Sequence, residues 1–153
     1  MAAGYTLVID CADPDRLSRF WAAALGYVIE PPPAGLASWD EYWRGFGLPE
    51  EYLGLGEDRI VDPDGRGPRI WFQVVPDRKT VKNRLHIDIH ASGDKPHADG
   101  RAIPLEVRRQ RVEAEASRLA ALGATVVSVR HEEGSSHYAI AMRDPEGNEF
   151  DIN

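Results

Sequence analysis

The sequence predicts an α+β fold in which one strand–helix–strand module occurs twice. Residues 7–10 (LVID) have an apolar strand pattern, and a helical stretch ending at Gly26 follows them. The same order recurs from residues 85–88 (LHID) to a helical stretch that ends at Gly123, and each half also carries an Asp-Pro-x-Gly turn. A module repeated within one short chain indicates a paired architecture with a cavity between the halves.

In the first half, the alternation of residue types predicts a strand over residues 5–11. Asp13 followed by Pro14 is a typical helix start, because the carboxylate can accept backbone N–H groups and proline fits the first helical turn. Gly26 is a typical helix end. Further strands are predicted at residues 28–30 and 69–75, on either side of an irregular segment at residues 34–66.

The irregular segment contains an aromatic insert, in which ring residues at helical spacing before Gly47 predict a short helix. The rings are those of Trp39, Tyr42, Trp43 and Phe46. Such an insert either packs against the sheet or covers a cavity, where Trp39 and Trp43 would suit a flat or apolar ligand. We expect Trp71 to lie on the opposite face of its strand from Gln73, in the core.

In the second half, the pattern predicts a strand over residues 84–90, a polar loop over residues 92–104 and a helix over residues 105–122. The remaining strands are expected at residues 124–130, 137–142 and 149–153. No segment has the composition of a linker between independent parts. We therefore expect a single compact domain spanning residues 1–153.

The composition excludes several classes of protein. The chain has 153 residues and a formal net charge of −7, whereas nucleic-acid binders usually present a basic face. No apolar run is long enough to cross a bilayer and no leader pattern precedes the first strand, so we expect no membrane partner and a cytoplasmic location. The single cysteine, Cys11, fits a reducing compartment and a buried structural thiol.

Strand periodicity places the candidate chemical groups on one face. His86, Asp88 and His90 alternate along one strand, and Asp10 is the repeat counterpart of Asp88. The alternate residues, Leu85 among them, would then lie against the helix. Two carboxylates in one cavity would repel each other, and either could serve as a general base. An ion pair with Arg84 or Lys82 is the alternative role for these carboxylates.

The order and spacing of several motifs identify a family resemblance over nearly the whole chain. The motifs are residues 13–17 (DPDRL), 20–21 (FW), 62–68 (DPDGRGP), 82–88 (KNRLHID) and 144–150 (DPEGNEF). Together they resemble the vicinal oxygen chelate superfamily, and within it the glyoxalase-like domains of the glyoxalase/bleomycin resistance/dioxygenase family.

The resemblance implies two βαβββ modules that form a curved mixed sheet around a central cavity. The first module would span residues 4–77, with the aromatic insert at residues 36–60, and the second would span residues 82–153. The resemblance also implies a small-molecule ligand, and it makes a homodimer a reasonable expectation.

The resemblance further implies four metal-ligand positions, which fall at Thr6, Gln73, His86 and Asp151. A hydroxyl such as that of Thr6 is a poor ligand, and aligning LVID with LHID would put Val8 there instead. Gln73, His86 and Asp151 could together hold a divalent transition metal (Zn, Ni, Fe or Mn) weakly. Alternatively, His86 is a hydrogen-bonded cavity residue, Gln73 is an ordinary sheet residue and Asp151 is merely exposed.

The resemblance implies two alternative functions. In the first, the chain is a metal-dependent lyase, isomerase or dioxygenase-like enzyme, in which Asp88 or Asp10 moves protons beside the metal. Gln73 cannot supply the carboxylate base that a glyoxalase I reaction needs. In the second, the chain is a metal-free protein that sequesters a flat, cationic compound such as an antibiotic. In either case the residues expected to line the substrate cavity are Thr6, Val8, His90, Trp39 and Trp43.

Overall fold

The computed structural model describes residues 3–93 and 103–153, so most of the predicted loop at residues 92–104 lies outside the described residues. The chain divides into two compact units, Met1–Arg78 and Lys79–Asn153. Each unit contains a four-stranded mixed sheet and follows the predicted βαβββ order. Among the described residues, no helix is both long and apolar enough to cross a membrane.

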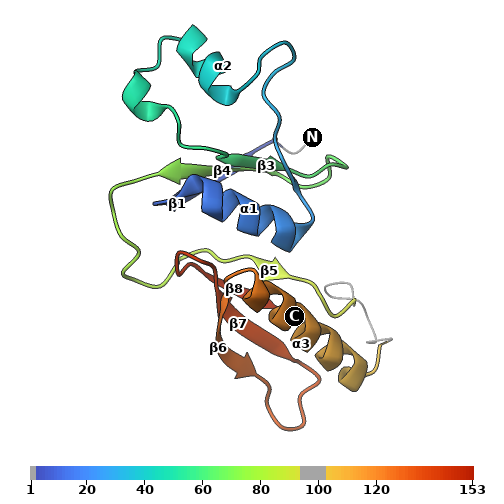
Figure 1. Cartoon of the computed structure of the whole chain (residues 1–153). Coiled ribbons are helices and arrows are strands. Elements are labelled where there is room, and N and C mark those ends of the chain that lie inside the picture. Colours follow the sequence, from blue (N-terminus) through green and yellow to red (C-terminus); the bar gives the residue numbers. More distant parts are fainter. Residues whose placement is uncertain (1–2, 94–102) are drawn as a thin grey trace. The chain divides into compact units, whose positions relative to one another are not determined.

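The first unit has a sheet in the order β1-β4-β3-β2. Its elements are β1 (Thr6–Cys11), α1 (Pro14–Leu25), β2 (Val28–Ile29), α2 (Trp39–Gly45), the 3₁₀ helix η1 (Glu50–Tyr52), β3 (Arg59–Val61) and β4 (Arg69–Val74). The pair β1–β4 is parallel and the other pairs are antiparallel. Helix α1 covers one face of this sheet, and the insert with α2 lies on the other side (Figure 1).

The predicted helix signals of the first unit are confirmed. Asp13 accepts the backbone N–H of Arg16 at 3.0 Å, and Pro14 begins α1. Gly26 ends the helix with a φ of 71°, a left-handed conformation that glycine adopts without steric cost. The apolar side of α1 is buried with the sheet residues Ile60, Ile70 and Phe72, and Cys11 is also buried, as expected.

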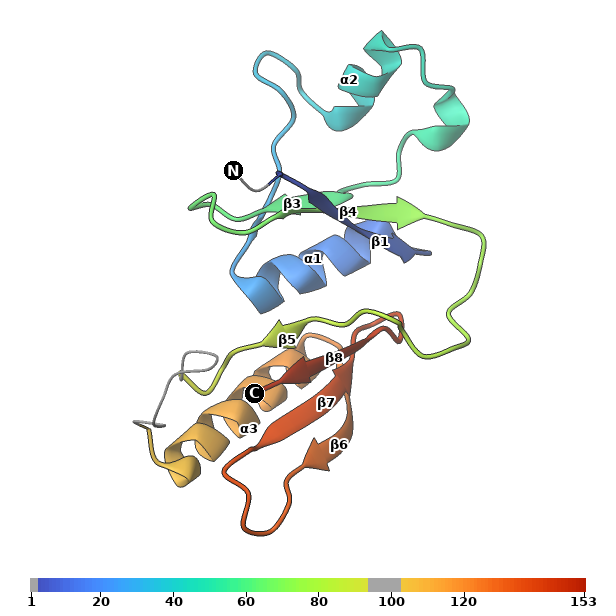
Figure 2. The ribbon, with the colours of Figure 1, turned by 180° about the vertical axis from the view of Figure 1, so that it is seen from behind.

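The second unit repeats this topology with the order β5-β8-β7-β6. Its elements are β5 (Asp88–Ile89), α3 (Leu105–Ala121), β6 (Thr125–Arg130), β7 (Ala139–Arg143) and β8 (Glu149–Ile152). Helix α3 covers one face of the sheet (Figure 2). Val112 and Leu119 on α3 are fully buried, as are Met142 and Ile152 on the sheet.

Both Asp-Pro-x-Gly motifs form turns that their first aspartate stabilises. The Asp62 carboxylate accepts backbone N–H groups from Asp64, Arg66 and Gly67, and these bonds hold the pKa of Asp62 below its usual value. Asp144 accepts the backbone N–H groups of Glu146 and Asn148 at 2.9 Å in the same way. The repeat is therefore present in local hydrogen bonding as well as in topology.

Three details of the sequence prediction were wrong. Strand β3 lies inside the segment expected to be irregular. Strand β5 comprises Asp88–Ile89 rather than residues 84–90, and Leu85 is consequently 81% exposed instead of packed against the helix. Trp71 shares a face with Gln73 because the two are separated by two positions, and it is only partly buried, outside the core.

Candidate metal centre

A row of polar side chains crosses the face of the second sheet opposite α3. Asp88 on β5 is the register partner of Asp151 on β8, and Asp151 is the partner of Ala141 on β7. Directly paired residues project from the same face of a sheet. Because Asp88 and Asp151 are register partners, their carboxylates lie side by side. His86 lies two positions before Asp88 on the same side.

His86, Asp88 and Asp151 form a compact cluster of donor atoms. His86 Nε2 lies 3.3 Å from Asp88 Oδ1 and 3.8 Å from Asp151 Oδ2. One ligand atom from each residue can be chosen so that all three lie within 4.8 Å of one another. The Asp151 side chain is mostly buried at 14% exposure, whereas those of His86 and Asp88 are nearly half exposed. Solvent therefore reaches the cluster at His86 and Asp88 but largely not at Asp151.

Neighbouring polar groups complete a connected network. Arg130 Nη1 on β6 lies 3.4 Å from Asp151 Oδ2 and offsets part of the acidic charge. Asn153 donates through Nδ2 to Asp88 Oδ2 at 3.3 Å, and its Oδ1 lies 2.7 Å from His90 Nδ1. Asp88 therefore pairs with His86 and Asn153, and the ion pair with Arg84 or Lys82 considered above is not formed among the described residues.

Glu149 holds the segment that leads to His86. Its Oε2 accepts the backbone N–H of Asn83 at 3.1 Å and lies 3.1 Å from Lys79 Nζ. The Asn83 hydrogen bond, together with Lys79, lowers the pKa of Glu149 from 4.5 to about 2. On the other side of His86, Ile87 O accepts the backbone N–H of Asp151 at 3.0 Å. Both contacts fix the backbone around His86 although that residue precedes the strand.

The cluster fits a divalent transition metal. One imidazole nitrogen and two carboxylate oxygens suit Mn, Fe, Ni or Zn, and no thiol is present in the cluster. Two donors that each lie about 2.1 Å from one ion are at most about 4.2 Å apart. The observed span of 4.8 Å needs only a small contraction, which the two half-exposed side chains can supply by rotation.

The first unit carries counterparts of this cluster with altered chemistry. Asp10 pairs with Gln73 as Asp88 pairs with Asp151, and both pairs are 63 positions apart in sequence. The matched spacing supports aligning LVID with LHID, which puts Val8 rather than Thr6 at the position of His86. A valine offers no ligand atom, and Asp10 is exposed. Gln73 as a metal ligand and Asp10 as a base stay predictions.

The other predicted cavity residues lie on several different elements. Trp39 and Trp43 line a pocket inside the first unit together with Gln73. Thr6 and Val8 are exposed on β1, and His90 belongs to the network of the second sheet through Asn153. Asp88 was predicted as a proton carrier and not as a ligand. That role stays a prediction, and the structure places the Asp88 carboxylate among the possible ligand atoms. The signal in the sequence that could have indicated this is that His86 and Asp88 are two positions apart.

Comparison with known proteins agrees with this architecture. The sequence matches the family model of a glyoxalase-like domain over residues 6–153. No curated protein matches it significantly.

Solved structures with a similar fold include an enzyme of the glyoxalase/bleomycin resistance/dioxygenase family. An enzyme of that family from Burkholderia phytofirmans has a TM-score of 0.55 at 16% identity, covering 97% of this chain and 94% of the other. The fosfomycin resistance protein FosX from Listeria monocytogenes has a TM-score of 0.59 at 12% identity, covering 100% and 92%. That FosX structure contains Mn(II) and 1S,2S-dihydroxypropylphosphonic acid. The oxidase ChaP-H2 has a TM-score of 0.52 at 13% identity, covering 99% and 91%.

Proposed function

The chain belongs to the family of glyoxalase-like domains, and from this premise we propose that it is a metal-dependent enzyme acting on a small molecule. The observation that supports the proposal is the cluster of His86, Asp88 and Asp151, whose donor atoms fit within 4.8 Å. The Mn(II) in the FosX structure supports a transition metal as the occupant.

The residues of the cluster and their neighbours would have different roles in this function. His86, Asp88 and Asp151 would hold the cation, which when bound would stabilise negative charge developing on substrate oxygens. Arg130 lies beside Asp151 with its side chain 54% exposed, so its remaining N–H groups can bind an anionic group of the substrate. Asn153 would orient Asp88 through its 3.3 Å hydrogen bond.

The reactions expected of such a site share one requirement. Lyase, isomerase and dioxygenase chemistry in this family would each place two neighbouring substrate oxygens at the metal. A site with three protein ligands leaves coordination positions open for both oxygens. Gln73 cannot act as a carboxylate base, so a glyoxalase I reaction is not the one we propose.

Calorimetric titration of chelator-treated protein with MnCl₂ and ZnCl₂ tests the proposal. We expect one metal per chain. His86→Ala and Asp151→Asn should each lose more than the roughly 10–100-fold in affinity that removing an outer-shell partner costs. His137→Ala is the matched control, because His137 is an exposed histidine of the same unit outside the cluster. Equal affinity of the wild type and both cluster variants would overturn the proposal.

A further inference from the structure

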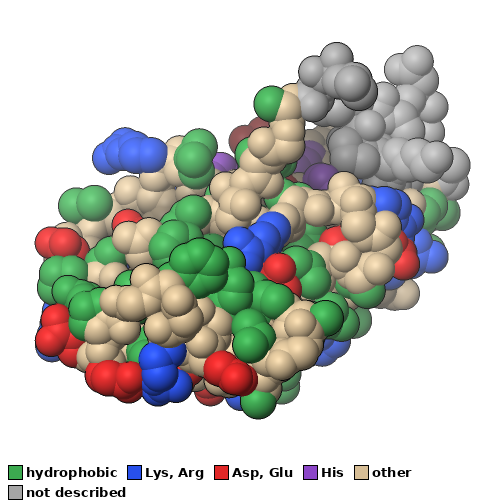
Figure 3. All heavy atoms as spheres, turned by 90° about the horizontal axis from the view of Figure 1, so that it is seen from above, with side chains coloured by type: hydrophobic (Ala, Val, Ile, Leu, Met, Phe, Trp, Pro, Cys, Tyr) green, Lys and Arg blue, Asp and Glu red, His purple; other side chains and the backbone are tan. Residues whose placement is uncertain are grey.

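A pocket lies within the first unit, between the aromatic insert and β4. Its volume is about 350 Å³. Most of its lining is aromatic or aliphatic, from Trp39, Trp43, Leu48, Tyr52, Leu55 and Trp71. This size is at the small end of the range of about 300–1,000 Å³ that ligand pockets occupy. Hydrophobic side chains gather on the face of the molecule that carries α2 and η1 (Figure 3). Leu48, Tyr52 and Leu55 of the lining are exposed.

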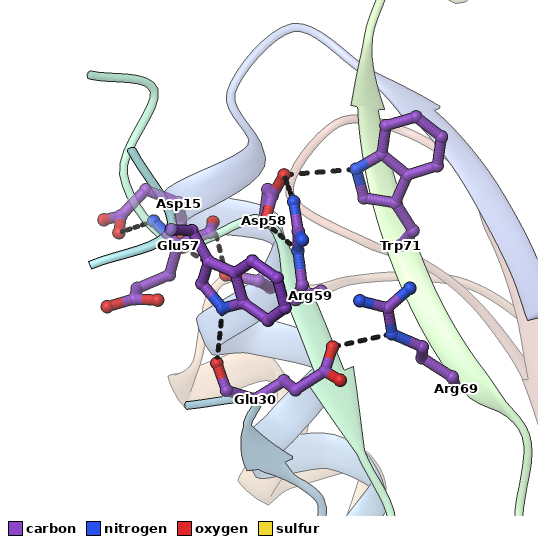
Figure 4. A network of polar contacts seen from close by, with 9 residues as sticks. Asp15, Glu30, Glu57, Asp58, Arg59, Arg69 and Trp71 are labelled. Carbon is purple, nitrogen blue, oxygen red and sulfur yellow. Dashed lines mark hydrogen bonds and ion pairs between the residues drawn. The ribbon is translucent and has the colours of Figure 1, made fainter. Parts of the chain in front are cut away.

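The polar edges of two of the indoles are already engaged by the protein. Trp39 donates its Nε1–H to Glu30 O at 2.9 Å, and Trp71 donates its Nε1–H to Asp58 Oδ2 at 3.1 Å. Figure 4 shows the Asp58 carboxylate joined by dashed lines to both Arg59 and Trp71. With these N–H groups satisfied, the two indoles offer a ligand their apolar ring surfaces rather than unpaired donors.

A buried ion pair makes the pocket wall rigid. The Arg59 side chain is 4% exposed and binds Asp58 at 2.5 Å. Its guanidinium carbon lies 4.0 Å from the centroid of the Trp39 ring, within cation–π range. Trp39 is therefore held from one side by Arg59 and at its edge by Glu30. A wall fixed before binding lowers the entropic cost of ordering it around a ligand.

Two polar groups of the lining set the ligand's chemistry. The side-chain amide of Gln73 is half-buried and makes no hydrogen bond within the described part of the chain, so it can both donate to and accept from a ligand. Asp40 adds a carboxylate, while the charges of Asp58 and Arg59 cancel. The lining thus carries one net negative charge, which disfavours anions.

We propose that this pocket binds a planar aromatic ring system that is neutral or cationic and carries a hydrogen-bonding group for Gln73. The rings of Trp43 and Trp71 supply stacking or edge contacts, and the Gln73 amide fixes the orientation. Binding at this site needs no metal. This proposal can therefore be tested independently of the function proposed for the second unit.

The first experiment uses 2-naphthol as the probe and follows the indole N–H signals by NMR. The chain has four tryptophans, and Trp21, which is 2% exposed in α1, serves as the internal reference. We expect the signals of Trp39, Trp43 and Trp71 to shift on titration while that of Trp21 stays in place. Decahydro-2-naphthol, which is not planar, and naphthalene-2-sulfonate, which is anionic, should shift them at least tenfold less at equal concentration.

Variants then separate stacking from hydrogen bonding. Trp43→Ala should weaken 2-naphthol binding about tenfold, the equivalent of one aromatic contact. Gln73→Leu should weaken the binding of 2-naphthol but leave the binding of naphthalene, which has no hydrogen-bonding group, unchanged. Phe46→Ala is the control, since Phe46 lies just after α2, is 72% exposed and lies outside the lining. The proposal would be overturned if the planar and the saturated probe bound equally, or if the Trp21 signal shifted as much as those of the pocket tryptophans. Both outcomes are measured on the wild type, so they do not depend on whether Trp43→Ala folds.

Discussion

Glu149 makes the stability of the protein depend on pH in a way that one substitution can isolate. The pKa of Glu149 falls from 4.5 to about 2 because its carboxylate accepts the Asn83 N–H and pairs with Lys79. A carboxylate with a lowered folded-state pKa stabilises the protein above its unfolded pKa. That contribution is fully present above about pH 4.5 and is lost as the pH falls towards 2.

The magnitude follows from the size of the shift. A change of 4.5 − 2 = 2.5 pKa units corresponds to about 3.4 kcal/mol. The side chain is 15% exposed at the sheet, and screening by solvent reduces the expected contribution to about 1.5–2 kcal/mol. Glu149→Gln should therefore lower the free energy of unfolding by that amount at pH 7 and by much less at pH 2.5.

Urea denaturation followed by circular dichroism at several pH values between 7 and 2.5 measures this difference. Glu132→Gln is the control, because Glu132 is exposed in a loop and should change stability by less than about 0.5 kcal/mol. The reasoning is refuted if the deficit of Glu149→Gln is the same at every pH, or if the two variants behave alike.

Three further substitutions test other parts of the structure. Asp58→Asn leaves the buried Arg59 charge without its partner and should cost about 3–5 kcal/mol by urea denaturation; a loss no larger than that of Asp64→Asn, in an exposed pair, would contradict this. Arg130→Ala removes a cation 3.4 Å from Asp151 Oδ2. Loss of this repulsive charge should tighten metal binding several-fold in calorimetry. Weaker metal binding would contradict this and would show that Arg130 orients the Asp151 carboxylate. Gly67→Ala should destabilise the protein on thermal denaturation, because the added Cβ would clash with Tyr27 Oη. An unchanged Tm would contradict this expectation.

Much of the fold could be predicted because its signals are local. The Asp13–Pro14 start, the Gly26 end and the Asp-Pro-x-Gly turns each depend on residues within a few positions of one another, and the repeat gave the order of elements. Strand β3 was missed because it is three residues long and begins with Arg59, a charged residue whose burial depends on a distant tryptophan. Strand β5 was predicted too long because alternation suggests a strand over residues 84–90, whereas only Asp88 and Ile89 are paired in register with β8.

The candidate site was predicted only in part. Alternation along the predicted strand correctly put His86 and Asp88 on the same side, although His86 precedes β5, and the resemblance added Asp151. The register of β5 against β8 brings Asp151 beside Asp88. This register depends on pairing across the sheet and cannot be deduced from the sequence of either strand alone. The pocket lining was partly missed because Trp71 was assigned to the wrong face of β4.

Paramagnetic NMR with Mn²⁺ tests the central claim most directly. The chain has five histidines, and their ring signals can be resolved after isotope labelling. If the cluster holds the metal, substoichiometric Mn²⁺ should broaden the His86 ring signals beyond detection while those of the exposed loop residues His131 and His137 remain. Asp151→Asn should abolish this selectivity. Equal broadening of all three histidines, or none below millimolar Mn²⁺, would contradict the assignment.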